Sequence, residues 1–184
     1  MVEKGLADHG WSYINIDDGW QGRRGGRYNA IQPNKKFPDM AALTREIHDM
    51  GLRVGIYSTP WIGTYAAHIG SYSDRPDGEN EWIEKGLHNE NYRYQKPGGN
   101  YWEDRCEVWH HGPYSFVEAD VKQWAEWGID YLKYDWHPLN YYHVREMFDM
   151  LRKIDRDIIF SLSNSAPYGD APVWQRYANC WRTT

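Results

Sequence analysis

Lys133 and Asp135 lie two residues apart in the segment YLKYDWHP, where they interrupt an otherwise apolar and aromatic run. Side chains two apart on a β-strand point to the same face, so a strand here would place the ammonium and the carboxylate side by side. Burying either charge is unfavourable unless it pairs with a counter-charge or a polar ligand. The spacing therefore indicates either a structural ion pair or a site in which a carboxylate works beside a cation.

Two further apolar runs end in polar residues. Asp17 and Asp18 follow the run WSYINI, and Ser163 and Asn164 follow the run IIFSL. A single aspartate at such a place is commonly a cap for the helix or loop that follows. Because separate runs end in carboxylates, a shared site for acid–base or nucleophilic chemistry is the favoured interpretation.

The elements that would position these residues alternate along the chain. Short apolar runs alternate with segments of helical period, which is typical of a parallel α/β protein. Five strands are predicted, at 11–17, 53–58, 131–135, 158–163 and about 180–183. The first four are nearly apolar on both faces, as buried parallel strands are. Three helices are predicted, at 39–50 with Asp39 as its cap, at 115–127 with a Ser-x-x-Glu capping box, and at 141–154.

Residues 63–112 break this alternation with clusters of Gly, Pro, Asn, Asp and aromatic residues. Long irregular insertions usually form a lid or a binding wall. This one follows the second strand, on the side of an α/β barrel that carries the active site. The short basic segment GRRGGR at 22–27 is interpreted as a turn, with phosphate contact as the alternative.

The aromatic content is high, at 16%, with 11 Trp and 15 Tyr against 4 Phe. Trp and Tyr combine a flat apolar face with a polar edge, which suits sugar sites, interfaces and large polar cores. Trp61 and Trp136 lie just beyond predicted strand ends. Each can stack on a sugar ring or fill the core.

The composition argues against several other classes of protein. The chain has 184 residues, 41% of them hydrophobic and 26% charged, enough to bury the core of one domain. Lys and Arg total 21 against 26 Asp and Glu, and this mildly acidic balance disfavours nucleic acid as a partner. No apolar stretch approaches the roughly 18 residues that a membrane span needs, and the first residues lack the apolar core of a signal peptide.

Cysteine and histidine usage does not indicate a metal site. Cys106 and Cys180 lack a metal-binding spacing and indicate no compartment. His110, His111 and His137 could suggest zinc, but adjacent histidines rarely converge on one ion, so a solvated loop is favoured. No metal and no cofactor are expected.

Five segments, in this order, resemble segments of glycoside hydrolase family 27, the α-galactosidase and melibiase family. They are IDDGW at 16–20, KFPD at 36–39, GLRVGIYS at 51–58, WGIDYLKYD at 127–135 and NCWRTT at 179–184. The resemblance runs from about residue 5 to the last residue and is poorest over 63–112. It implies an α/β (β/α)8 TIM barrel, of which residues 1–184 are a partial catalytic domain with about strands 2 to 6. It also implies hydrolysis of terminal α-galactosides with retention.

The resemblance implies a role for each matching residue. Asp135 would be the nucleophile that attacks the anomeric carbon, with Lys133 beside it keeping it ionised. The substrate-binding residues would be Asp17 and Asp18 at the 4- and 6-hydroxyls, Lys133 at the 3-hydroxyl, Tyr57 and Arg182 in the same pocket, and Asn164 and Tyr168 near the 2-position. For Tyr168 an exposed loop is the alternative.

The sequence also departs from the family pattern. The second carboxylic acid is expected four positions after Arg182, beyond Thr184, so this polypeptide alone is predicted not to turn over substrate. His137 stands where many relatives have a cysteine. Asn164 stands where many have a glutamate, so β-L-arabinopyranosides and isomaltodextrins remain alternative substrates.

Two other functional classes stay open. A galactose-binding barrel without catalysis would use the same aspartates and aromatic residues, and a metal-dependent barrel enzyme would use Asp17, Asp18 and a histidine. A partial barrel has two open sheet edges, so self-association through them is an expectation. The cellular location stays open, with a secreted or periplasmic location favoured for the parent protein.

Overall fold

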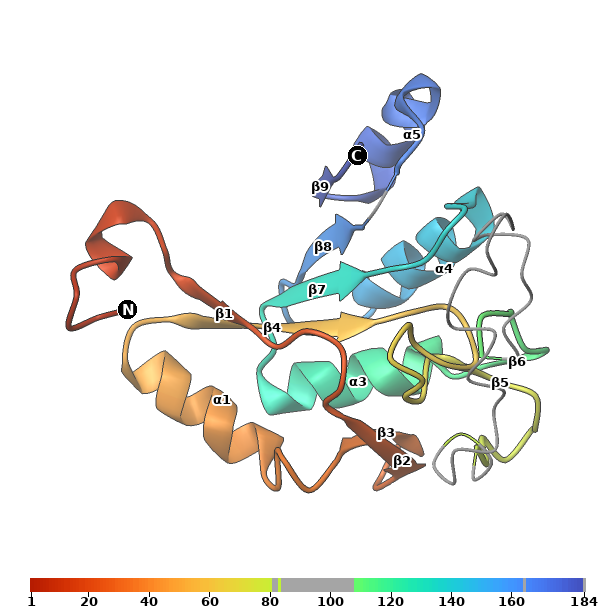
Figure 1. Ribbon diagram of the computed structural model, residues 1–184, viewed down its shortest axis with the longest axis horizontal. Helices are drawn as coiled ribbons and strands as arrows, with labels where there is room; N and C mark the ends of the chain where they lie inside the picture. The colour runs from red at the N-terminus through yellow and green to blue at the C-terminus, as the bar shows by residue number, and fades with distance from the viewer. Residues whose placement is uncertain (81–82, 84–107, 164, 184) are drawn as a thin grey trace, which may run out of the picture.

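A five-stranded parallel sheet organises the chain. The computed structural model describes residues 1–80, 83, 108–163 and 165–183. The strands are β1 (Tyr13–Asn15), β4 (Arg53–Ser58), β7 (Tyr131–Tyr134), β8 (Ile159–Leu162) and β9 (Cys180–Trp181), and they pair in this order (Figure 1). Every pair is parallel. The five predicted strands are therefore confirmed. Strand β4 has the predicted bounds, and the other four are shorter than predicted.

Helices connect these strands. They are α1 (Met40–Asp49), α3 (Val117–Trp127), α4 (Tyr141–Leu151) and α5 (Ala171–Tyr177), with short 3-10 turns η1 (Ala7–His9) and η3 (Tyr168–Asp170). Figure 1 shows α1 and α3 along one face of the sheet. The three predicted helices are confirmed. Helix α5 was not predicted, because seven residues are too few to show a helical period.

The helix ends test the capping predictions. The Asp39 carboxylate accepts a hydrogen bond from Ala42 N at 2.8 Å, so the predicted cap of α1 is confirmed. The predicted capping box at Ser115 is wrong, because α3 begins at Val117 after Phe116, which makes no side-chain cap. The Ser115 hydroxyl instead donates to the Glu146 carboxylate of α4 at 2.6 Å. A hydrogen bond to a charged acceptor is stronger than one to a neutral group, so this contact orients the Ser115 hydroxyl toward α4.

The two faces of the sheet differ in polarity. Val54, Ile56 and Leu132 point toward the helices and are at most 1% exposed. On the other face, Asn15 and Arg53 are exposed and Lys133 is half-buried. The prediction of strands that are apolar on both faces is therefore wrong for this inner face. An inner face that carries charge is where a barrel can place polar ligands.

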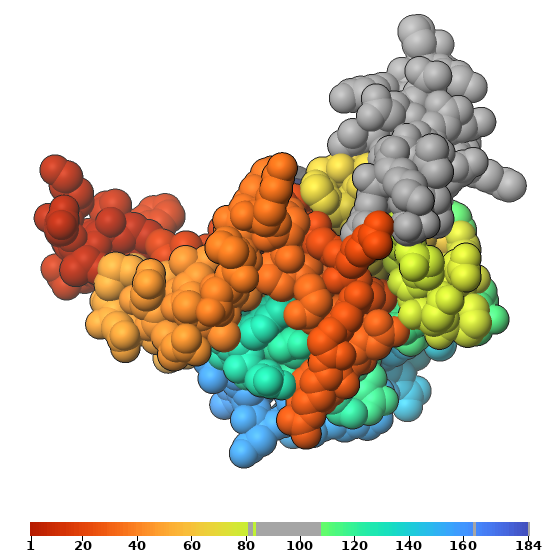
Figure 2. Space-filling model, turned by 90° about the horizontal axis from the view of Figure 1, so that it is seen from below, coloured from red at the N-terminus to blue at the C-terminus, as the bar shows by residue number. Residues whose placement is uncertain are grey.

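An antiparallel hairpin lies where the sequence predicted a turn. Strands β2 (Gln21–Gly25) and β3 (Ala30–Pro33) include most of the basic segment 22–27. Figure 2 shows this hairpin against α3 on one side and the residues that lead up to position 80 on the other. Hydrogen bonds support both contacts, from Asn29 Nδ2 to Asp77 O at 2.9 Å and from Gln32 Nε2 to Gln123 Oε1 at 3.2 Å.

Arg24 holds the hairpin in place through a buried ion pair. Its guanidinium lies 2.7 Å from Asp120 Oδ1, and the two side chains are 2% and 0% exposed. It also donates to Gly70 O at 2.6 Å and lies 4.4 Å from the centre of the Phe116 ring. Asp120 Oδ1 accepts a further hydrogen bond from Ile31 N at 2.9 Å. Of the basic residues in segment 22–27, Arg24 is therefore bound to groups of the protein itself.

The described parts of the 63–112 insertion contain more regular structure than predicted. Strand β5 (Tyr72–Ser73) pairs antiparallel with β6 (Tyr114–Ser115). The beginning and end of the insertion also lie together, because Gly63 N donates to Val108 O at 2.7 Å and Ile62 N donates to His110 O at 3.0 Å. Cys106 lies outside the described residues. Across the described part of the chain, no helix has the length and apolar character that a membrane span requires.

Replacing Arg24 by Met removes the counter-charge of Asp120 and leaves a buried carboxylate unpaired. We expect the free energy of unfolding to fall by about 3 to 5 kcal/mol, as measured by urea denaturation. The control is Arg75→Met, which removes an exposed ion pair with Asp77 at 3.2 Å. It should leave the midpoint of urea denaturation unchanged. Equal effects of the two substitutions would contradict the anchoring role of Arg24.

Candidate functional site

The register of the sheet places the predicted site residues in two layers. Tyr57 pairs with Lys133, and Lys133 pairs with Ser161. Asp135 and Ser163 lie two residues further along adjacent strands, so they stand abreast in the next layer. The backbone ladder continues to this height, with Asp135 N donating to Ser58 O at 2.9 Å and Ser163 N to Tyr134 O at 3.1 Å.

The turn after β1 brings in the two remaining aspartates. Trp20, which ends the IDDGW segment, is fully buried, and its indole donates to Tyr57 O at 2.9 Å. Asn34 Nδ2 donates to Gly19 O at 2.8 Å and fixes the same turn. Asp17 and Asp18 therefore lie above the carboxyl end of the sheet.

Lys133 connects carboxylates from two strands. Its ammonium lies 3.0 Å from both oxygens of Asp17 and 3.9 Å from Asp135 Oδ2. It also lies 5.0 Å from the centre of the Tyr57 ring. The Asp17 side chain is 66% exposed and the Asp135 side chain is 6% exposed. The cluster thus joins an open carboxylate to a buried one through a single cation.

The buried carboxylate of Asp135 experiences opposing influences. Burial raises the pKa of Asp135 above its usual value of 3.8, and the Lys133 ammonium is the largest influence that lowers it. The Ser163 hydroxyl and the Tyr57 phenol also lower this pKa, and the charge of Asp17 raises it. Such a balance between burial and a specific cation is typical of functional carboxylates.

Tyr57 lies between the two halves of the site. Its side chain is 1% exposed, and burial raises the pKa of its phenol, followed by the negative charges of Asp135 and then Asp18. Asp18 is also largely buried, and burial raises its pKa. The Thr64 hydroxyl, the hydrogen bond from Ala66 N and His68 each lower the pKa of Asp18, and the charge of Asp17 raises it.

Two tryptophans expected as stacking partners are buried. Trp61 is 3% exposed, with its ring 5.9 Å from the Trp109 ring at an interplanar angle of 22°. Trp136 is fully buried, with its ring 5.0 Å from that of Tyr134. Their burial favours the alternative in which these two rings fill the core.

The remaining predicted residues lie at or beyond the edge of the cluster. Arg182 is exposed, and the β8–β9 register places it abreast of Ser163. Tyr168 is 84% exposed, so its ring contacts little of the described protein. The exposed-loop alternative fits this position. Asn164 lies outside the described residues.

The expectation that all three histidines lie in a solvated loop is wrong for His111. Its ring stacks on that of His143 at 3.9 Å, and its Nδ1 donates to Pro60 O at 3.0 Å. Burial, with the charge of His143, lowers the pKa of His111 to about 4. His110 lies 3.2 Å from Asp74 at the surface. Within the described ranges, no group of three or more His, Cys, Asp and Glu side chains could hold a metal ion.

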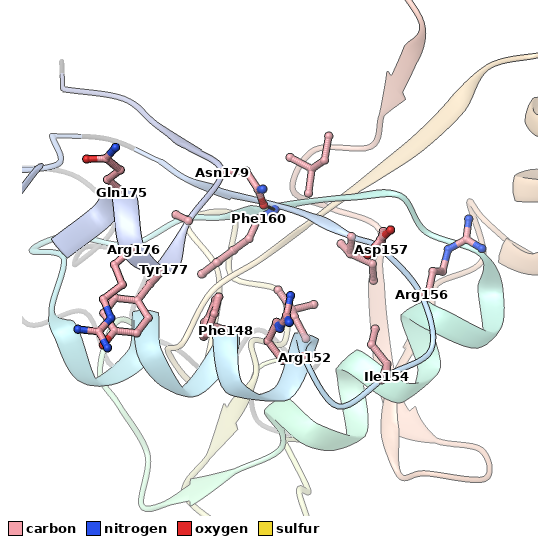
Figure 3. Close-up of a pocket in the computed structure, with 14 residues that line it drawn as sticks. Phe148, Arg152, Ile154, Arg156, Asp157, Phe160, Gln175, Arg176, Tyr177 and Asn179 are labelled. Carbon is pink, nitrogen blue, oxygen red and sulfur yellow. Dashed lines mark hydrogen bonds between the residues drawn. The ribbon is translucent and has the colours of Figure 1, made fainter. Parts of the chain in front are cut away.

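A hollow elsewhere carries none of the predicted site residues. It has a volume of about 540 Å³ and opens between α4, β8 and α5, with Phe148, Phe160 and Arg152 among its lining residues (Figure 3). It lies near the amino end of β8, whereas Asp135 and Ser163 follow the carboxyl ends of β7 and β8. The chemistry therefore points to the carboxylate cluster, not to this hollow.

The sequence did not single out the residues around Asp18. Thr64, Ala66 and His68 all belong to the insertion, which was predicted as a lid or a binding wall only as a whole. A loop without periodicity gives no signal for its individual residues, because its contacts depend on how the chain returns to the sheet.

Two buried aspartates should respond to pH in opposite ways. Because folding raises the pKa of Asp135, stability falls as pH rises above 3.8, and Asp135→Asn should melt higher than wild type at neutral pH. For Asp130, burial opposes ionisation, but Val54 N, His48 and Arg156 together lower its pKa below 3.8. Asp130→Asn should therefore melt lower at neutral pH, with its deficit vanishing as acid protonates the wild-type group. Thermal midpoints of the two variants and of wild type, measured between about pH 3 and 8, test both expectations. If both variants change the midpoint at neutral pH in the same direction, the opposite pKa shifts assigned to Asp135 and Asp130 are contradicted.

Comparison with known proteins agrees with this geometry. Residues 1–89 match a family model described as alpha galactosidase A. All of the chain aligns with a probable alpha-galactosidase B of Neosartorya fischeri at 34% identity, and with alpha-galactosidase A of Cellvibrio japonicus at 32% identity. The chain spans 42% and 36% of the lengths of these two relatives.

A solved structure shows the same fold. The crystal structure of alpha-galactosidase I from Mortierella vinacea matches 98% of this chain with a TM-score of 0.68 and 25% identity, and this match covers 38% of that chain. The five parallel strands are thus part of a (β/α)8 TIM barrel. The chain belongs to glycoside hydrolase family 27, the family of the α-galactosidases.

Proposed function

We propose that the protein to which this chain belongs is a retaining glycosidase that releases terminal α-linked galactose. The observation that carries the proposal is the contact of Lys133 with Asp17 and Asp135 at the carboxyl end of the sheet. Active sites of (β/α)8 barrels lie at this end. The similarity to α-galactosidases supports the choice of substrate.

Asp135 is the nucleophile in this proposal. An oxygen of its carboxylate bonds to the anomeric carbon while the bond from that carbon to the leaving oxygen breaks, which forms a glycosyl ester. Water then cleaves the ester and restores the carboxylate. Lys133 favours the ionised form that attack requires, against the effect of burial. The leaving oxygen needs a proton from a second carboxylic acid, which the family resemblance places four positions after Arg182.

The other charged groups bind the sugar. Asp17 and Lys133 face the opening of the site, where a carboxylate and an ammonium can bind neighbouring hydroxyl groups. The Oδ1 atom of Asp18 is buried and has no hydrogen-bond partner among the described residues. A sugar hydroxyl would satisfy it, and a buried acceptor without a partner is otherwise unfavourable.

A galactosyl donor with a fluoride leaving group tests the nucleophile directly. Fluoride departs without a proton, so 5-fluoro-α-galactosyl fluoride should form a covalent ester on the chain even without the second acid. Mass spectrometry of the digested protein should locate the label on Asp135. Asp135→Ala should abolish labelling, and Asp149→Ala, which changes an exposed carboxylate on α4, should not.

Other outcomes of the same assay decide between the functional classes. An unlabelled wild-type chain that still binds galactose would favour a binding protein without catalysis. Labelling that excess chelator abolishes would favour the metal-dependent class. A label on any other residue would overturn the assignment of Asp135.

Asp18→Asn should weaken galactose binding by about tenfold or more, because a hydrogen bond to a charged acceptor contributes about 1.5 to 3 kcal/mol. Titration of the chain with galactose, followed by NMR, measures the dissociation constant. Asp74→Asn, which changes an exposed carboxylate beside His110, is the matched control and should bind like wild type. Unchanged affinity in Asp18→Asn would remove this residue from the sugar site.

A further inference from the structure

Glu146 of α4 attaches the insertion to the body of the protein. We call residues 59–73 and 108–116 the first and second arms of the insertion; β5 lies in the first arm and β6 in the second. One Glu146 oxygen accepts a hydrogen bond from the Tyr72 phenol at 2.5 Å, and the other accepts one from the Ser115 hydroxyl at 2.6 Å. A single carboxylate thus contacts both arms.

A pair of histidines forms a second contact between the arms and α4. The His111 ring stacks on the His143 ring, with 3.9 Å between their centres and an interplanar angle of 21°. His143 is 5% exposed, and its Nδ1 lies 3.7 Å from Glu146 Oε2. The Nδ1 atom of His111 donates to Pro60 O in the first arm at 3.0 Å. The His111 ring therefore holds the second arm both to α4 and to the first arm.

The groups around this pair of rings can balance one positive charge. The titratable groups that face the pair or its contacts are Tyr72 of β5, Tyr134 of β7, Tyr142 and Glu146 of α4, and His110 of the second arm. The tyrosines are uncharged between about pH 5 and 8. His110 pairs with Asp74 at the surface. Among the facing groups, Glu146 alone supplies a negative charge, so one proton on the pair is compensated and a second is not.

We propose that the stacked rings of His111 and His143 form an acid-sensitive latch, which holds the second arm to α4 and to the first arm near neutral pH and releases it in mild acid. A second proton would place two charged rings 3.9 Å apart in a largely buried position. In the open form the rings are separated and hydrated, so protonation there is not opposed, and acid favours opening. The first arm also carries Ala66, whose N–H donates to Asp18, so the latch supports the segment that contacts the carboxylate cluster.

The pKa values in this cluster agree with the charge count. Burial, with the charge of His143, lowers the pKa of His111 from 6.5 to about 4. Burial raises the pKa of Glu146, but His143, Ser115 and Tyr72 together lower it below 4.5, so Glu146 stays ionised while the histidines titrate. Because the pKa of His111 is lower in the closed form than in the open form, the closed form loses stability as pH falls below 6.5. Between about pH 8 and 5, the equilibrium constant for opening should rise by about thirtyfold.

Hydrogen exchange of backbone amides, followed by NMR, measures this opening. The reporters are two amides that bond one arm to the other, Ile62 N to His110 O at 3.0 Å and Phe116 N to Ser71 O at 2.9 Å. Their protection factors in wild type should fall by about thirtyfold between about pH 8 and 5. The amide of Ile159, which bonds within the sheet, should keep its protection, because the latch opens locally.

Substitutions at two adjacent histidines separate a latch from a passive contact. His111→Phe keeps a ring against His143 but cannot take a proton, and His111→Asn keeps a donor for Pro60 O. In both variants the reporter amides should change protection by less than about threefold over the same pH range, whereas a merely structural role would lower protection equally at every pH. His110→Phe changes the exposed neighbour, is the matched control and should respond to pH like wild type.

Three results would overturn the inference. They are protection of the reporter amides that does not depend on pH in wild type, an equal pH dependence in wild type and the His111 variants, and an equal loss of protection at Ile159, which would indicate global unfolding. If neither His111 variant folds, NMR titration of the His111 ring in wild type decides: a pKa well below 6.5 supports the latch, and a pKa near 6.5 contradicts it. No sugar is present in these measurements, so the proposed function stands or falls separately.

Discussion

The ammonium of Lys133 lies between two carboxylates that are 118 residues apart in the sequence, Asp17 and Asp135. Without this cation, Asp135 would be a buried negative charge near a second one, and both burial and repulsion would favour its protonated form. The contact exists only because β1, β4 and β7 are parallel and in register, so that their carboxyl ends meet at one edge of the sheet. The arrangement of strands thus brings Asp135 beside the cation that favours its ionised form.

The protein treats its buried charges in two different ways. Arg24 and Asp120 form a nearly inaccessible pair supported by further hydrogen bonds, and this pair attaches the hairpin to α3. Around Asp135 and Asp18, pairing is less complete, and burial raises the pKa of both. Complete pairing suits a structural role, because an uncompensated buried charge is destabilising. Incomplete pairing leaves acceptors that a ligand can satisfy, at the expense of the stability of the empty site.

The insertion after β4 contributes to both the fold and the site. Its first part contacts Asp18 through Ala66, and its last part returns alongside residues 62 and 63. Insertions on this side of a barrel strand are where members of one fold differ in substrate. The contact of Ala66 N with Asp18 brings the first part of this insertion to the carboxylate cluster.

Much of the architecture was predictable because it depends on local patterns. The strand at 53–58 and the helix that Asp39 caps have clear signals in hydrophobic period and end residues. The spacing of Lys133 and Asp135 predicted that both lie on one face, and the structure places both beside Tyr57. The predicted capping box at Ser115 was wrong, and the contact that its hydroxyl makes instead, with Glu146 on a different helix, has no local signal in the sequence.

The sequence by itself determined the alternation of strands and helices, the residue types at the strand ends and the family, since each depends on neighbours along the chain. Only the tertiary structure decided that Lys133 lies closer to Asp17 than to Asp135, that Trp61 and Trp136 are buried, and that residues 64–68 surround Asp18. These are contacts between segments far apart in sequence. Their distances depend on strand register and on the return path of an insertion, which no local periodicity encodes.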